Sequence, residues 1–271
     1  TLATLVAFVL FYRLAHAVIG ETGARRSLLY LATYPLGFIL FAVYPESLFL
    51  ALALGAWLCA LSKRWAFAGI LGGLAALTRA QGILLILPLA FLFVRQNRLR
   101  QVGVGRAAWL SLIIAGSALY VLYLWGLTGS PFAWLSVENI WLQSAPPWDS
   151  ISAAVLTLFQ NSDLGILFFA LLDILTVVLF FALMIFQMQR GEWSYAFLIA
   201  IIMIPPLFTV ARYIPPLPLA PLPRYLVLAF PGFIELGRFN LRAPLVFALA
   251  LLSLLIQTLL LIAFAHWVFI A

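Results

Sequence analysis

Long apolar runs separated by short polar clusters constrain the fold of this chain more than any other feature. Several runs approach the roughly 20 residues that a helix needs to cross a bilayer. Only 8% of the residues are charged, whereas a soluble domain carries about 25% charged residues. The runs also lack the polar–apolar alternation of the strands in a membrane barrel. We therefore expect an all-α, polytopic membrane protein.

The polar breaks divide the chain into about ten predicted transmembrane segments. These are 1–19, 27–44, 46–62, 65–78, 82–94, 107–127, 164–187, 193–210, 224–236 and 243–269. The short runs 65–78 and 82–94 fit either one bent element or two partly buried helices. Within the first of them, Gly69, Gly72 and Gly73 have a spacing that indicates close helix packing.

The basic residues predict the orientation of the segments. If residue 1 lies outside and each segment crosses once, all but three of the 15 Lys and Arg residues are cytoplasmic, as the positive-inside rule requires. The three exceptions are Arg79, Arg212 and Arg224. The cytoplasmic loops are then 20–26, 62–65, 95–106, 188–192 and 237–242. Because topology explains the net charge of +7, we expect no nucleic-acid partner.

The longest loops fall on the predicted outer face of a single integral membrane domain, residues 1–271. One is 128–163, in which 151–162 is expected to lie along the membrane interface as a helix. The other is the proline-rich stretch 211–224, expected to be extended. Long loops on one face favour binding or chemistry on that face.

The sequence carries few motifs of known chemistry. His16 and His266 are isolated at opposite ends of the chain, and neither a Gly-rich phosphate loop nor a Ser/His/Asp set is present. Cys59 is the single cysteine, so it forms no intrachain disulfide. The sequence identifies no specific cofactor, and it leaves the use of a divalent metal open.

Two acidic residues stand near or within apolar runs. Glu46 follows Pro45, a good first-turn residue, and a carboxylate at a helix start is favoured by the helix dipole. The same residue also suits a binding site, and the two roles are compatible. Asp173 lies in the middle of 164–187, where a carboxylate must be protonated, paired or facing a polar cavity. We expect it to be paired inside the bundle.

Three motifs occur in an order that resembles the PIG-V family of mannosyltransferases. They are Tyr44 with Glu46-Ser47-Leu48-Phe49, the turn Lys63-Arg64-Trp65 followed by Ala68-Gly69, Leu77-Thr78-Arg79 and Gly82, and the run from Leu222 to Phe233, "LPRYLVLAFPGF". The loop with Pro131-Phe132, Trp141 and Pro147-Trp148 is similar more loosely. The resemblance spans nearly the whole chain, although Ala80 and Pro221 depart from the residues that are usual in the family.

The resemblance implies a GT-C fold and transfer of mannose from a polyprenyl- or dolichyl-phosphate carrier. The expected acceptor is a lipid-linked sugar, a glycan or a glycolipid on the non-cytoplasmic face. The expected location is the plasma membrane of a bacterium or archaeon, or the endoplasmic reticulum. The partners would be membrane lipids, the lipid-phosphate-linked sugar and the acceptor.

The family's presumed catalytic carboxylate belongs to a Trp-Asp pair in its first outer loop. The only such pair here, Trp148-Asp149, stands in a later loop, so we do not transfer the role to it. Either the chain is the C-terminal part of a longer GT-C chain, or it lacks the catalytic loop. In the second case it would be a non-catalytic subunit that binds lipid or scaffolds a complex with a membrane-protein partner. A transporter is a third interpretation.

Transfer of a sugar from a lipid phosphate needs cations that hold the phosphate and a carboxylate that accepts a proton. Arginine pairs with phosphate through a planar fork and keeps its charge. Arg224, Arg79 and Arg212 are therefore the predicted donor-phosphate ligands, with snorkelling to lipid headgroups as the alternative. Glu46 is the candidate catalytic carboxylate.

The residues beside these charges are expected to line the substrate cleft. They are Tyr44, Ser47, Gln81 and Tyr225. We further predict that Glu46, Arg79 and Arg224 converge around one cavity at the outer end of the bundle.

Overall fold

The computed structural model describes residues 2–96, 104–133, 135–136, 142–211, 218–219 and 221–266, and this part of the chain is almost entirely helical. In chain order the helices are α1 (Leu2–Thr33), η1 (Gly37–Leu40), α2 (Glu46–Leu61), α3 (Trp65–Thr78), η2 (Ala80–Leu85), α4 (Ile86–Gln96), α5 (Val104–Ala107), η3 (Ala108–Leu110), α6 (Ser111–Thr128), α8 (Pro147–Gln160), α9 (Leu164–Gln189), α10 (Trp193–Leu207), α11 (Pro221–Leu226), α12 (Phe230–Arg238) and α13 (Ala243–Ala265), where η marks a 3-10 helix. The all-α prediction is confirmed.

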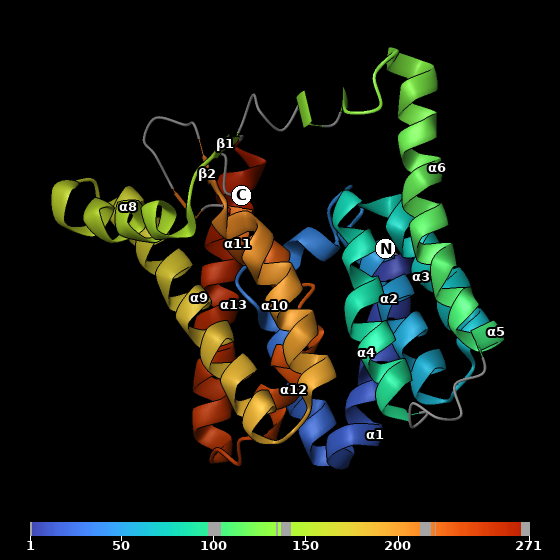
Figure 1. Cartoon of the computed structure of the whole chain (residues 1–271). Helices are drawn as coiled ribbons and strands as arrows, with labels where there is room; N and C mark the ends of the chain where they lie inside the picture. Colours follow the sequence, from blue (N-terminus) through green and yellow to red (C-terminus); the bar gives the residue numbers. More distant parts are fainter. Residues whose placement is uncertain are drawn as a thin grey trace.

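The helices form two groups that follow the order of the chain (Figure 1). Helices α1, α2, α3, α4 and α6 pack in one group, and α9, α10 and α12 pack in the other, beside which Figure 1 shows α13. The two groups meet where α1 packs on α12 and α13, and where α4 packs on α10. The buried apolar core is continuous between them and includes large side chains such as Trp57, Phe180 and Phe230.

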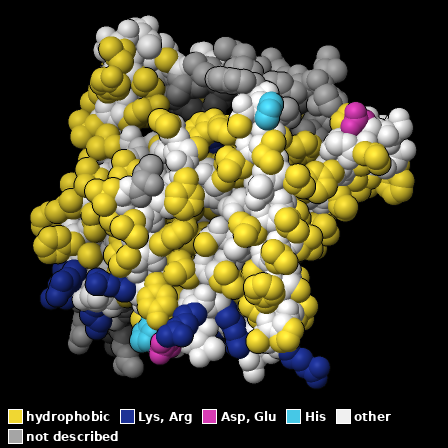
Figure 2. All heavy atoms as spheres, turned by 180° about the vertical axis from the view of Figure 1, so that it is seen from behind, with side chains coloured by type: hydrophobic (Ala, Val, Ile, Leu, Met, Phe, Trp, Pro, Cys, Tyr) yellow, Lys and Arg dark blue, Asp and Glu magenta, His cyan; other side chains and the backbone are white. Residues whose placement is uncertain are grey.

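Four of the described helices are long and apolar enough to span a membrane, namely α1, α9, α13 and the stretch Gly105–Thr128 that contains α6. The exposed hydrophobic side chains that cover the outside of these helices suit lipid better than water (Figure 2). The chain is therefore an integral membrane protein. Helices α2, α3, α4 and α10 are apolar but shorter, so the predicted count of ten segments is not reproduced.

Two predicted segments are not single helices. In the region 27–44, α1 ends at Thr33 and a buried 3-10 turn follows, because Pro35 disfavours a helical conformation in the residue before it. In the region 224–236, α11 ends at Leu226 and α12 begins at Phe230. Both regions are apolar because they are buried in protein, and burial alone does not require a continuous helix.

Helix α1 consists of two helical parts joined at Gly20, which has a φ of 75°. Only glycine adopts this left-handed region at little cost, so the residue permits the chain to reverse at the end of the first predicted segment. The expected close packing at the glycines of α3 is confirmed. A Cβ atom on Gly69 would lie 2.0 Å from the carbonyl oxygen of Trp109, and one on Gly73 would lie 2.6 Å from that of Leu112.

The described residues of the five loops predicted to be cytoplasmic lie at one end of the bundle. Arg26 donates hydrogen bonds to Asn240 Oδ1 at 3.2 Å, which joins 20–26 to 237–242. Arg238 bonds Glu192 at 2.6 Å and so joins 237–242 to 188–192. Arg95 donates a hydrogen bond to the carbonyl oxygen of Gly191, within 188–192. Gln96 donates one to the carbonyl oxygen of Ala60, close to 62–65. Lys and Arg side chains gather at this end (Figure 2). The cytoplasmic location of this end stays a prediction.

The described parts of the long loops lie at the opposite end. Strands β1 (Leu142–Ser144) and β2 (Thr209–Ala211) pair antiparallel, with Gln143 opposite Val210. The predicted segment 151–162 is largely helical as part of α8 (Pro147–Gln160), which lies crosswise to α9 in Figure 1. Its location at the membrane interface stays a prediction. The proline-rich stretch is not extended throughout, because its last part forms α11, which begins at Pro221. Proline is favoured at the first position of a helix.

Candidate functional site

Glu46 is the first residue of α2, directly after Pro45. A carboxylate in the first turn is stabilised by the partial positive charge of the helix N-terminus, so the prediction of a helix-start glutamate is confirmed. Its side chain is 0% exposed. A carboxylate buried this deeply must be paired with cations to remain ionised.

Two arginines pair with Glu46, and both contact the same oxygen. Arg79 Nη1 lies 2.6 Å from Oε1, although its N–H is not aligned as a hydrogen bond to any described atom. Arg224 Nε and Nη2 each lie 2.7 Å from Oε1. The second oxygen, Oε2, is buried and has no hydrogen-bond partner among the described residues. One carboxylate thus faces two guanidinium groups.

Each arginine is fixed by the end of a helix and by a tyrosine ring. Arg79 follows the last residue of α3 in an extended conformation, and its guanidinium carbon lies 5.0 Å from the centre of the Tyr225 ring. Arg224 lies in α11, and its guanidinium carbon lies 4.1 Å from the centre of the Tyr44 ring. Both distances are within the range of cation–π attraction.

Helix α11 is held in place by a buried tyrosine that sequence reasoning did not identify. The Tyr34 hydroxyl donates a hydrogen bond of 2.7 Å to the carbonyl oxygen of Pro223, the residue before Arg224. The Tyr34 ring is 6% exposed and packs edge-on against Phe180 and Phe233. Because Tyr34 follows the end of α1, this bond connects the first half of the chain to the arginine of the second half.

A cavity of about 440 Å³ opens beside the two arginines. Arg79, Arg224, Gln81 and Tyr225 line it, as predicted. Further polar side chains come from Thr78, at the end of α3, and from Tyr120 and Thr128 on α6. Sequence reasoning did not select these three. The signal that could have found them is that Thr78 and Thr128 stand at the outer ends of predicted segments.

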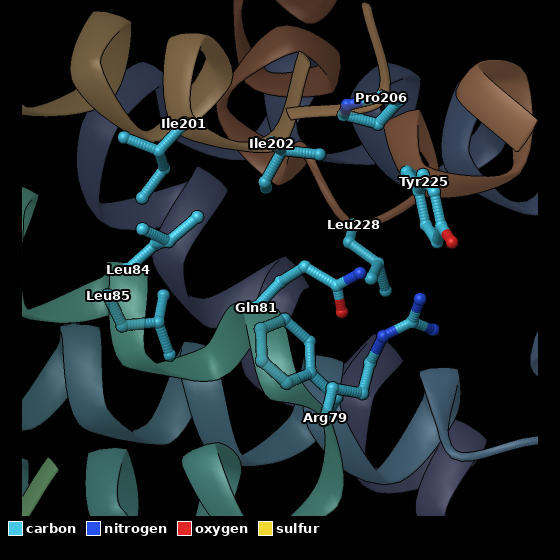
Figure 3. A pocket seen from close by; sticks show the side chains of 10 residues that line it. Arg79, Gln81, Leu84, Leu85, Ile201, Ile202, Pro206, Tyr225 and Leu228 are labelled. Atoms are coloured by element: carbon cyan, nitrogen blue, oxygen red, sulfur yellow. The ribbon is translucent and has the colours of Figure 1, made fainter. Parts of the chain in front are cut away.

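A second, narrow cavity of about 20 Å³ shares Arg79, Gln81 and Tyr225 with the first. Figure 3 shows the side chains of Arg79 and Gln81 facing those of Ile202 and Pro206 from α10. Its volume is close to that of a single water molecule. It marks the apolar side of the site, where the two helix groups meet.

The remaining predicted site residues have different surroundings. Ser47 is buried in the first turn of α2 and lines neither cavity. Tyr44 is 38% exposed and contacts the site through Arg224. Arg212 lies outside the described residues. The expected convergence of Glu46, Arg79 and Arg224 is present, whereas the catalytic role of Glu46 stays a prediction.

Asp173, on α9, is 6% exposed, so its side chain faces the inside of the bundle. No salt bridge joins it to a residue in the described ranges, and the expected ion pairing is not found there.

Asp163, at the end of the outer loop, has a structural role as the N-cap of α9. Its Oδ1 accepts hydrogen bonds from the backbone N–H groups of Gly165 at 2.7 Å and Ile166 at 3.2 Å.

A second ion cluster lies at the opposite end of the bundle. The two oxygens of Glu235 bond Arg190 and Arg238, each at 3.0 Å, and Arg238 also bonds Glu192 at 2.6 Å. Burial lowers the pKa of Arg238, but the hydrogen bonds and charges of Glu192 and Glu235 outweigh it and raise this pKa above its ordinary value. The cluster ties α12 to the turn between α9 and α10.

In the part of the chain that the structure describes, no group of three or more His, Cys, Asp or Glu side chains could hold a metal ion. Comparisons with protein-family models, with curated proteins and with solved structures found no match for this chain.

Proposed function

We propose that this chain is a membrane glycosyltransferase that takes mannose from a polyprenyl- or dolichyl-phosphate carrier. The observation that supports it best is the pair of arginines, Arg79 and Arg224, that share the single carboxylate of Glu46 beside a cavity of about 440 Å³. Within the described residues this group carries an excess positive charge, which favours an anionic ligand. The three motifs that resemble the PIG-V family suggest that this anion is the phosphate of a lipid-linked sugar.

In this proposal the arginines hold the carrier phosphate as negative charge returns to it. Their fixed positions matter, because preorganised cations stabilise developing charge without reorganising during the reaction. Glu46 holds both guanidinium groups in position through buried ion pairs. The hydroxyl and amide groups of Thr78, Gln81 and Thr128 line the same cavity and suit the hydroxyl groups of a sugar.

A second function is favoured by a specific feature of the cavity. None of the described residues that line it is acidic, and Glu46 is enclosed behind the arginines. A group that accepts the proton of the acceptor hydroxyl is thus missing from the described lining. The alternative is a non-catalytic, GT-C-like subunit that binds the lipid phosphate or scaffolds a membrane complex.

The Arg224→Lys variant of the full-length protein tests the proposal. Lysine keeps the charge but loses the two-pronged geometry. A hydrogen bond to a charged group contributes roughly 1.5–3 kcal/mol, so transfer from radiolabelled polyprenyl-phosphate mannose should slow roughly ten- to a hundredfold. Arg190→Lys, at the other end of the bundle, is the matched control and should leave the rate unchanged.

Two other outcomes distinguish the alternatives. An Arg224→Lys rate equal to that of the wild type, with folding verified, would mean that the arginine does not bind the donor. A wild-type protein that binds polyprenyl phosphate saturably but transfers no sugar to any lipid or glycan acceptor would favour the non-catalytic subunit. In that case Arg224→Lys should still weaken binding.

A further inference from the structure

A third cavity shares no lining residue with the two cavities of the candidate site and is larger than either. It is a groove of about 610 Å³ along α1, α2 and α3. Aliphatic side chains such as Leu10 and Leu52 line most of it, and the small residues Gly55 and Cys59 line it on α2. A Cβ atom on Gly55 would lie 3.1 Å from Leu71 Cδ1, so the glycine allows α2 and the Leu71 side chain to lie close together.

The groove is apolar along its length and cationic at one end. Its lining on α1 runs from Leu2 to Arg13, which is roughly 16 Å of helix. That length is close to the half-thickness of the hydrocarbon layer, about 15 Å. Arg64, in the loop 62–65, lines the groove as well. The loop 62–65 belongs to the end of the bundle where basic residues gather (Figure 2).

Neither arginine is neutralised by the part of the protein that the structure describes. Both are exposed, and no salt bridge joins Arg13 or Arg64 to a described residue. An occupant that complements this surface must have an anionic group at one end and an apolar body of about one leaflet in length. An apolar helix would satisfy the walls but would leave both charges unpaired.

We propose that this groove binds an anionic glycerophospholipid. The phosphate lies between Arg13 and Arg64, and an acyl chain lies along α1 and α2 past Cys59. Arginine forks match phosphate oxygens well, and basic pockets between helices at the cytoplasmic side suit anionic headgroups. The site is separate from the cavity at Arg79, because the whole of α3 lies between Arg64 and Arg79, a rise of roughly 21 Å.

Cys59 provides a direct test, because it is the only cysteine of the chain and lines the groove. The rate of its modification by a maleimide is measured on the purified full chain in mixed micelles, with increasing phosphatidylglycerol or phosphatidylcholine. We expect phosphatidylglycerol to slow the modification severalfold at a mole fraction where phosphatidylcholine has little effect. Native mass spectrometry should count one retained phosphatidylglycerol.

The variant Arg13→Gln/Arg64→Gln should require about tenfold more phosphatidylglycerol for the same protection, since charge-assisted hydrogen bonds are lost. Both arginines are exposed, so the variant should fold. Lys63→Asn is the matched control. It removes a charge from the same loop without touching the groove, and Asn tolerates the left-handed conformation of Lys63, whose φ is 58°.

Three results would overturn the proposal. Equal protection of Cys59 by phosphatidylcholine would mean that the groove does not recognise an anionic headgroup. Protection that is unchanged in the double arginine variant would mean that Arg13 and Arg64 do not bind the phosphate. A Cys59 that is unreactive in lipid-free detergent, together with a dimer by light scattering, would mean that a second copy of the chain covers the groove.

Discussion

The two ion clusters occupy opposite ends of the same helix bundle, and water reaches them to different degrees. At one end, Glu46 is 0% exposed and its partners Arg79 and Arg224 are 8% and 18% exposed. At the other end, Glu235 is 1% exposed, but its partner Arg190 is 51% exposed. Both clusters join helices that are distant in sequence. They differ instead in how exposed their arginine side chains are.

The balance of charge differs as well. The cluster at Glu46 has one carboxylate for two arginines, whereas the opposite cluster pairs Glu192 and Glu235 with two arginines. A balanced cluster at a predicted cytoplasmic surface ties helices together and leaves little attraction for a ligand. An unbalanced cluster beside a cavity attracts an anion. We therefore expect a structural role for the cluster at Glu235 and propose a binding role for the cluster at Glu46.

Removal of the shared carboxylate should have the largest effect. Glu46→Ala leaves two buried guanidinium groups without their common partner, and the loss of one member of a buried pair costs about 3–5 kcal/mol. Reversible unfolding in mixed detergent micelles would measure the change. A loss of unfolding free energy below about 1 kcal/mol would mean that water solvates the two arginines. The two ion clusters would then not differ in their access to water.

Double-mutant cycles compare the clusters directly. For Glu46→Gln with Arg79→Met we expect a coupling free energy of roughly 1.5–3 kcal/mol, as for close pairs of opposite charge from which water is excluded. For Glu235→Gln with Arg190→Met we expect at most about 1 kcal/mol, because Arg190 is half exposed. Equal coupling free energies in the two cycles would contradict the difference in burial.

The contact of Arg224 with the Tyr44 ring should contribute a smaller amount. The ring is 38% exposed, and cation–π contacts at exposed sites contribute about 0.5–1 kcal/mol. Tyr44→Leu should therefore lower the free energy of unfolding by about this amount, and Tyr44→Phe, which keeps the ring, should have almost no effect. If Phe and Leu destabilise the protein equally, the phenol hydroxyl and not the ring is responsible.

Salt should produce the smallest and most selective change. Raising the ionic strength from 0.1 to 1 M shortens the screening length from about 10 Å to about 3 Å. The coupling of Arg190 with Glu235 should fall towards zero, while that of Arg79 with Glu46 should change little because water is excluded. The same double-mutant cycles in both buffers measure this. A salt-sensitive Glu46 pair would mean that the cavity admits ions up to the carboxylate.

Several helices could be predicted closely from the sequence. The predicted segments 46–62, 65–78 and 164–187 correspond to α2, α3 and α9 at Glu46–Leu61, Trp65–Thr78 and Leu164–Gln189. These boundaries were accessible because polar residues mark the points where a helix leaves hydrocarbon, and because backbone groups in hydrocarbon must form helical hydrogen bonds. Segments buried inside the protein lack this constraint, and there the prediction of continuous helices was wrong.

The amino-acid pattern by itself determined that the chain is an all-α membrane protein, which loops share an end, and which charged residues are out of place in an apolar chain. Those properties depend on the local cost of placing polar groups in lipid. Only the tertiary structure decided that Arg79 and Arg224 share Glu46, because Glu46 and Arg224 are 178 positions apart. It also decided that Tyr34 holds α11 and that Asp173 faces the bundle without an ion pair to any described residue. Such contacts depend on how the helices pack, which no local pattern encodes.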